Sequence, residues 1–153
     1  MKYRNYEVGF TFEVPDDFSE VKQSSYEVFN VPADTMHHFI QLDDNGDIVR
    51  SFSITKSEPM ETDDQIKEYI DKNLAQLDEL GIHKVIQNQI QTTDGRTIDR
   101  VVLYDENMEE DLGILTYFMK VKNVLIMASC YIVEFYDEYE EELYDIFDSI
   151  KEV

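Results

Sequence analysis

Apolar and polar residues alternate in short stretches along much of this chain. In EVGFTFEV (residues 7–14) one face carries only apolar side chains, namely Val8, Phe10, Phe12 and Val14. A period of two residues is typical of half-buried β-strands, and Pro15 ends the pattern because proline donates no ladder hydrogen bond. The other strand-like stretches are residues 26–31, 37–42, 48–54, 84–91, 97–104, 113–121 and 123–133.

The links between these stretches predict how the strands pair. Asn45-Gly46, between 37–42 and 48–54, predicts a hairpin because both residues tolerate positive φ. Short links join the last four stretches, which indicates an antiparallel meander. The final stretch contains VLIMASCYIV and is apolar on both pleat faces, as expected for a central strand covered on both sides.

Two longer stretches predict helices. Thr62 and Gln65 have the spacing of a capping box for a helix over residues 63–80, and Gly81 ends it. Its apolar stripe consists of Ile66, Tyr69, Ile70, Leu74, Leu77 and Leu80. Asp137 and Glu140 have capping-box spacing for a second helix over residues 138–151. The stripe of this second helix consists of Tyr139, Leu143, Ile146, Phe147 and Ile150.

The predicted order of elements is therefore ββββαββββα, in one α+β domain over residues 1–153. We find no internal repeat and no linker-like composition. A chain of 153 residues, of which 42% are hydrophobic, is large enough to bury one core.

Charge is the strongest signal in the composition. The 34 Asp and Glu residues outnumber the 13 Lys and Arg residues, for a formal net charge of −21. Such a surface repels phosphate, so nucleic acid and anionic membranes are poor partners and basic proteins are favoured ones. The single cysteine, Cys130, has no partner for an internal disulfide. With no signal-peptide pattern at the first residues, we expect a cytoplasmic protein.

Three segments resemble the PsbP-like superfamily: FTFEVPDDFSEV after the start, the helix opening TDDQIKEYI, and the closing IFDSIKEV. The superfamily is named after an accessory protein of photosystem II and includes a Ran-binding nuclear-import factor and bacterial effector chaperones. The resemblance implies an antiparallel sheet sandwiched between helices (three layers, α/β/α) and protein binding without catalysis. One departure is Phe18, where such proteins often carry Trp. No functional residue of a relative carries over.

Two candidate metal sites fail on their spacing. Asp43, Asn45 and Asp47 occupy the first, third and fifth places of an EF-hand loop, but Ile48 stands where glycine is needed and Ile54 where a bidentate Glu is needed. His37 and His38 are neighbours on a strand and therefore point to opposite faces. We expect a hairpin turn and a solvent-facing histidine pair, with no metal and no cofactor.

Nucleophilic and acid–base chemistry also lack support. Cys130 lies among apolar neighbours, where burial raises a thiol pKa, so we expect a buried structural thiol. No nucleophile elbow, phosphate-binding loop or HExxH motif occurs. The acids of residues 105–111 form an ordinary solvated loop in this interpretation.

The second helix carries the densest negative charge. Like charges four residues apart destabilise a helix, so its apolar stripe must hold it in place. Its outer face is either merely solvated or docks a basic partner. The candidate acidic surface comprises Glu138, Glu141, Glu142, Asp145 and Asp148.

These observations support two leading hypotheses. The first is a non-enzymatic interaction or chaperone-like module that binds a protein partner. The second is an acidic inhibitor of immunity-protein type that blocks a basic enzyme such as a nuclease. An enzyme of unrecognised kind is the third. An exposed apolar groove would favour the first, whereas steep salt dependence of one tight complex would favour the second.

Overall fold

The computed structural model describes residues 1–107, 113–132 and 136–153. A seven-stranded antiparallel sheet has the order β3-β4-β5-β9-β8-β7-β6, and a three-stranded sheet has the order β1-β2-β10. The large sheet contains β3 (Ser19–Glu20), β4 (His37–Leu42), β5 (Ile48–Lys56), β6 (Ile82–Gln91), β7 (Thr97–Asp105), β8 (Gly113–Val121) and β9 (Val124–Ile132). The small sheet contains β1 (Lys2–Asn5), β2 (Phe10–Glu13) and β10 (Lys151–Glu152).

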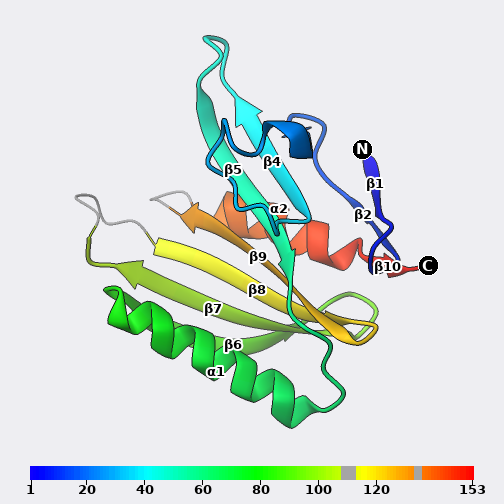
Figure 1. Cartoon of the computed structure of the whole chain (residues 1–153), viewed down its shortest axis with the longest axis vertical. Helices are drawn as coiled ribbons and strands as arrows, with labels where there is room; N and C mark the ends of the chain where they lie inside the picture. Colours follow the sequence, from blue (N-terminus) through cyan, green and yellow to red (C-terminus); the bar gives the residue numbers. More distant parts are fainter. Residues whose placement is uncertain (108–112, 133–135) are drawn as a thin grey trace.

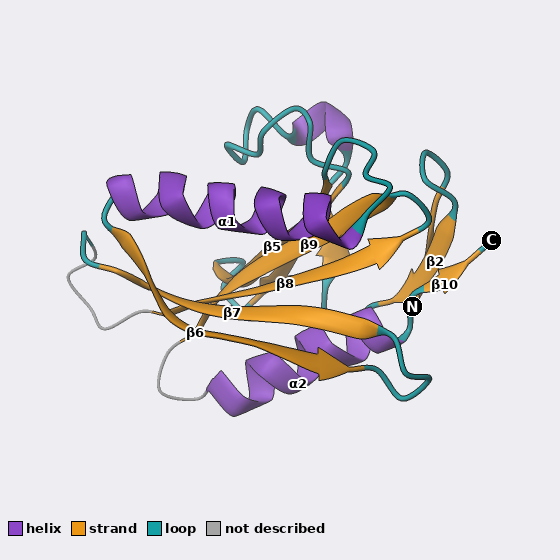
Figure 2. Cartoon of the chain, turned by 90° about the horizontal axis from the view of Figure 1, so that it is seen from below, coloured by secondary structure: helices purple, strands orange, loops and turns teal. Residues whose placement is uncertain are grey.

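Helices α1 (Asp63–Glu79) and α2 (Tyr136–Asp148) lie on opposite faces of the large sheet (Figure 1, Figure 2). The α+β class is confirmed, but the predicted order of elements is wrong at the ends of the chain. The first and last strands are short and carry no apolar run of their own, so the sequence pattern misses them. They form because β2 pairs with both of them at once.

Most local predictions are confirmed. The Thr62–Gln65 capping box is present, and Gly81 has φ +84 at the end of α1. The hairpin between β4 and β5 is present too, although only Gly46, and not Asn45, adopts positive φ. Hydrogen bonds from Gly46 N to Asp43 O and from Asp43 N to Asp47 O close this turn. The meander β6-β7-β8-β9 follows the predicted pairing.

The strand predicted over residues 26–31 is wrong. This segment follows a short 3-10 helix, η1 (Gln23–Ser25), and is itself a series of turns in which Asn30 has φ +56. Tyr26 and Val31 are buried without strand pairing and pack with Ile40 on the outer part of β4, whereas Val28 and Phe29 are 80% and 39% exposed. Apolar spacing alone did not distinguish anchored turns from a strand.

The start of α2 also differs from the prediction. The helix begins at Tyr136, so Asp137 lies in its first turn and is not the N-cap. Glu140, the other half of the predicted capping box, instead binds the guanidinium of Arg100 on β7. The helix ends at Asp148, and Lys151, predicted as helical, lies in β10.

The main core lies between the large sheet, the small sheet and α2. It includes the fully buried Phe10, Phe12, Phe39, Tyr117 and Phe147. A smaller cluster under α1 is centred on Ile70, Val101, Leu103, Phe118 and Leu125. Among the described residues, no helix is long and apolar enough to cross a membrane.

Candidate functional site

The described residues cover the α1 face of the large sheet only in part. α1 packs over Leu125, near the start of β9, and the turns after η1 cover Ile40 on β4. Between these two covers, Ser129 is exposed and Tyr131 is 56% exposed, although β9 is the fourth of seven strands. The prediction that β9 is covered on both faces is therefore wrong for its second half (Figure 1).

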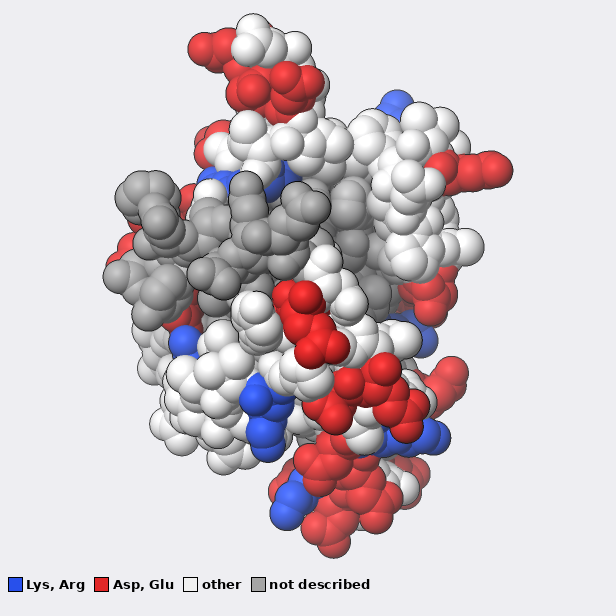
Figure 3. Space-filling view, turned by 90° about the vertical axis from the view of Figure 1, so that its left-hand side faces the viewer, with Lys and Arg blue, Asp and Glu red and all other residues white. Residues whose placement is uncertain are grey.

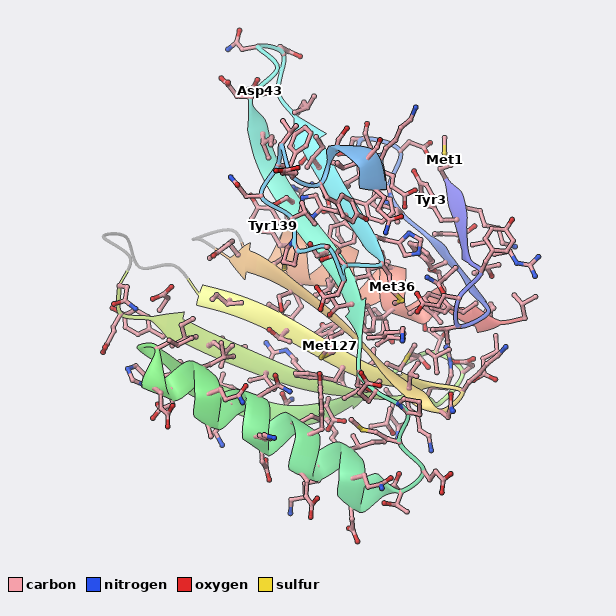
Figure 4. The ribbon with its side chains drawn as sticks, in the orientation of Figure 1. Met1, Tyr3, Met36, Asp43, Met127 and Tyr139 are labelled. Atoms are coloured by element: carbon pink, nitrogen blue, oxygen red, sulfur yellow. The ribbon has the colours of Figure 1, made fainter. Side chains whose placement is uncertain are left out.

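We call this uncovered region the open strip. It is a groove of about 370 Å³ whose lining residues come from the six neighbouring strands β4, β5, β9, β8, β7 and β6 and from α1. Its polar floor consists of His38, Ser51, Ser53, Thr55, Thr116 and Ser129, and its apolar side chains include Leu77, Ile82, Leu103, Ile114, Met127 and Tyr131. Met127 and the hairpin-tip residue Asp43 are labelled in Figure 4. None of the described residues that line the groove is Lys, Arg, Asp or Glu.

A row of polar side chains runs straight across the strip. The ladder registers place His38 opposite Ser53, Ser53 opposite Ser129, and Ser129 opposite Thr116. His38 Nδ1 lies 2.6 Å from Ser53 Oγ, and Thr116 Oγ1 lies 2.8 Å from Ser129 Oγ. Burial lowers the pKa of His38, which favours its neutral form at neutral pH. The row therefore offers uncharged donors and acceptors.

Acidic residues flank the strip at both ends. At one end the hairpin tip carries the exposed Asp43, Asp44 and Asp47, and at the other the end of α1 carries Asp78 and Glu79. Acidic side chains gather at the tip and again near the base of this side of the molecule, where several Lys or Arg side chains lie beside them (Figure 3). A ligand that reached both ends would therefore meet neutral contacts in the middle and negative charge beyond them.

The opposite face of β5 and β9 forms a second cavity against α2, of about 330 Å³. Arg50 lies in its wall, with its guanidinium carbon 5.1 Å from the Phe18 ring centre and 4.6 Å from that of Tyr139. Glu142 binds Arg50 through both carboxylate oxygens, at 2.5 and 3.0 Å. Arg50 on β5 therefore joins the β4–β5 hairpin to α2 through its contacts with Tyr139 and Glu142. Tyr139 is labelled in Figure 4.

The five acids predicted as one surface divide into two groups. Glu142 is engaged by Arg50, and Asp148 accepts hydrogen bonds from Thr93 N and Oγ1 at 2.7 and 2.9 Å. Glu138, Glu141 and Asp145 are exposed and have no ion pair with another described residue. Only the second group is available to a partner.

The prediction that His37 and His38 both face solvent is wrong. His37 is 9% exposed, packs against Phe12 and Phe39, and has Nδ1 at 2.7 Å from Glu20 and Nε2 at 3.0 Å from Asn5. His38, on the other face, lies in the open strip. Within the described residues, no cluster of three His, Cys, Asp or Glu side chains could hold a metal ion.

Cys130 is half-buried, whereas the sequence predicted a buried thiol. Burial raises its pKa to about 12, so the thiol stays protonated and is a poor nucleophile at neutral pH. Residues 105–107 of the acidic loop lie beside α1, where Asn107 donates to Leu80 O, and the rest of that loop lies outside the described residues.

Sequence reasoning missed the polar row altogether. The signal available was the alternation SFSIT in β5, where Ser51, Ser53 and Thr55 share one face, together with Ser129 inside an apolar strand. Only the strand register brings these hydroxyl groups side by side.

Comparison with known proteins identifies the fold. No protein-family model and no curated protein sequence matches the chain. Among solved structures, the cyanobacterial PsbP protein CyanoP from Synechocystis sp. PCC 6803 matches with a TM-score of 0.64 and 13% identity, over 100% of this chain and 92% of that one. The chain has a PsbP-like fold.

Two further structures support the same fold. The Ran-binding protein Mog1p of Saccharomyces cerevisiae matches with a TM-score of 0.61 and 11% identity, over 100% of this chain and 95% of that one. LpqN of Mycobacterium tuberculosis, a protein involved in cell envelope biogenesis, matches with a TM-score of 0.63 and 10% identity, over 99% and 90%. The resemblance deduced from the sequence is therefore confirmed at the level of the fold.

Proposed function

We propose that this protein is a non-enzymatic interaction module that binds a segment of a basic protein partner in the open strip. The observation that carries the proposal is the uncovered half of β9, where Ser129 and Tyr131 face solvent in the middle of the large sheet. An antiparallel sheet can leave one face to solvent, but that face is then usually polar, whereas Ile114, Met127 and Tyr131 line this groove. An exposed groove with apolar side chains is typical of a protein interaction site.

The chemistry of the strip limits what fits it. Ile114, Met127 and Tyr131, of which Tyr131 is 56% exposed, supply apolar contact beside the row of hydroxyl groups. The acidic ends favour Lys or Arg on either side of the docked segment. The partner segment therefore has an uncharged, partly apolar centre and basic flanks. The Ran-binding activity of Mog1p is a precedent for protein binding on this fold.

The acids of α2 have a lesser part in this proposal. Glu138, Glu141 and Asp145 lie on the helix that covers the other face of the sheet, so they add to long-range attraction and not to contact in the strip. The alternative function, inhibition of a basic enzyme through charge alone, would leave the strip unused. The cytoplasmic location remains a prediction from Cys130.

Site-specific photocrosslinking tests the proposal. A benzophenone amino acid at position 131, in the strip, is compared in cell extract with the same group at Tyr6, which is 81% exposed but belongs to the turn after β1. We expect a crosslinked protein from position 131 only. The protein identified is then purified, and its affinity is measured for the wild type and for Ser129→Arg, which places charge and bulk in the strip.

Weaker binding by at least about tenfold to Ser129→Arg, with an association rate that falls as salt is raised, supports the proposal. Equal affinity of the variant and the wild type contradicts it. Steep salt dependence without any effect of Ser129→Arg would favour the charge-only inhibitor. The thermal midpoint of the variant is the control for folding.

A further inference from the structure

We propose that β6 is the contact surface of a two-fold homodimer in which the β6 strands of two copies pair antiparallel. β6 is the last strand in the order of the large sheet, and no described strand pairs with its outer edge. Unpaired backbone groups along a ten-residue strand are a template for pairing with another chain. Ile82 at the start of β6 lines the open strip, but residues 86–91 do not, so the inference does not depend on the proposed function.

The charge of β6 sets it apart from the rest of the surface. Residues 82–93 contain no Asp or Glu, although 34 of the 153 residues of the chain are acidic. The central part, Ile86–Gln91, has no charged residue of either sign and no Pro or Gly. Two copies of a protein with a net charge of −21 repel each other, and a strand free of acids reduces that repulsion along the line of contact. The nearest acids, Asp63, Asp64 and Asp99, lie on α1 and β7 and not on β6 itself.

The side chains of this edge are also self-complementary. Across a two-fold axis the same patch meets itself, so each group must pair with its own kind. Amides satisfy this condition because they donate and accept, whereas carboxylates and ammonium groups do not. Among the described residues, Gln87 and Asn88 use only their side-chain oxygens, which accept from Lys84 and Arg100, and Gln89 uses only its side-chain nitrogen, which donates to Asp99. Donors and acceptors therefore remain for a second copy.

Apolar side chains gather at the same edge. Val85 and Ile86 are 60% and 47% exposed on β6, Leu80 is 67% exposed just before it, and Tyr104 is 39% exposed on the neighbouring β7. Their burial would add hydrophobic stabilisation to the backbone pairing. A strand bulge between Lys84 and Ile86 limits regular pairing to the remainder of the strand, which predicts a reversible dimer of moderate affinity.

The geometry of such a dimer has a consequence for binding. Antiparallel pairing of identical edges places the two-fold axis perpendicular to the sheet, so both copies present the same face on the same side. The two open strips would then face one way, and a partner with two binding segments would gain affinity from both.

Sedimentation velocity over a wide range of protein concentration tests the dimer. The variant Gln87→Glu/Gln91→Glu adds two acids per chain to β6, both at exposed positions. Its matched control, Gln23→Glu/Gln76→Glu, adds the same charge at exposed positions of η1 and α1. We expect the wild type and the control to dimerise, and the β6 variant to have a dissociation constant about tenfold higher or more.

A lysine variant separates local contact from overall charge. Gln87→Lys/Gln91→Lys lowers the net negative charge, so general repulsion alone would make it dimerise better. Pairing through β6 predicts that it dimerises worse, because like charges then face each other across the axis. A monomeric wild type at every concentration overturns the proposal, as does a dimer that none of the β6 substitutions weakens.

Cysteine crosslinking locates the axis. In a Cys130→Ala background, single cysteines are placed in turn at positions 86–91 and oxidised. Antiparallel pairing about a two-fold axis predicts a disulfide yield that peaks at one position and falls on both sides, because only residues near the axis meet their own copies. A flat profile contradicts the proposed interface, and unchanged thermal midpoints show that the variants fold.

Discussion

Replacing Glu142 by glutamine separates the acids of α2 that hold the structure together from those that are only exposed. Glu142 binds the Arg50 guanidinium with both oxygens, and the two side chains are 32% and 17% exposed. Glutamine is nearly isosteric but offers one oxygen and turns an amide donor toward a guanidinium that only donates. One charge-assisted hydrogen bond is lost and the remaining one is weakened.

The expected cost follows from that geometry. Hydrogen bonds to charged groups contribute about 1.5–3 kcal/mol, and partial exposure of Glu142 reduces this, so Glu142→Gln should lower the free energy of unfolding by about 1–2 kcal/mol. Glu141, the preceding residue, is exposed and lies four residues from Asp145. Glu141→Gln should therefore leave stability unchanged or raise it by about 0.2–0.5 kcal/mol.

Urea unfolding followed by circular dichroism measures both variants. With a typical slope of about 2 kcal/mol per molar urea, the midpoint of Glu142→Gln should fall by about 0.5–1 M, with the slope unchanged. A double-mutant cycle with Arg50→Met isolates the pair, since Glu142→Gln should cost little once the guanidinium is gone. Equal midpoints for Glu142→Gln and Glu141→Gln would refute the assignment of Arg50 and Glu142 as a structural brace.

Three further predictions concern stability. Hydrogen bonds to Asp78 and Glu106 raise the pKa of His83 in the folded protein. The stabilisation that protonated His83 gives is therefore complete below about pH 6.5, where the unfolded histidine is also protonated, and is lost as the pH rises through the higher pKa of the folded state. His83→Asn should flatten the pH dependence of the unfolding midpoint in that window. Thr62→Ala should cost about 1 kcal/mol by removing the cap of α1, whereas Thr62→Ser should restore most of it in the same urea titration. Phe147→Ala should cost about 3–5 kcal/mol because the ring is fully buried against Tyr117, and calorimetry should show a correspondingly lower thermal midpoint.

Local pattern predicted most of the regular elements because their causes lie within a few residues. The period of two in β4 and β5, the cap at Thr62 and the glycine at position 46 each depend on neighbouring backbone geometry. The same reasoning failed for residues 26–31, a short apolar run predicted as a strand, in which Tyr26 and Val31 are buried as anchors of turns. It also failed for β1, β3 and β10, which exist only because other strands pair with them.

The sequence by itself determined the class of this protein: an acidic α+β chain with an antiparallel meander, two amphipathic helices and no recognisable catalytic motif. Those features follow from composition and from spacing along the chain. The tertiary structure alone decided which surfaces are covered and which charged side chains form ion pairs within the fold. Ser129 is exposed because α1 and the turns after η1 leave a gap over β9, and Glu142 is engaged because the fold brings Arg50, 92 residues away in sequence, to its carboxylate. Coverage and pairing of this kind depend on distant segments meeting, and periodicity carries no information about that.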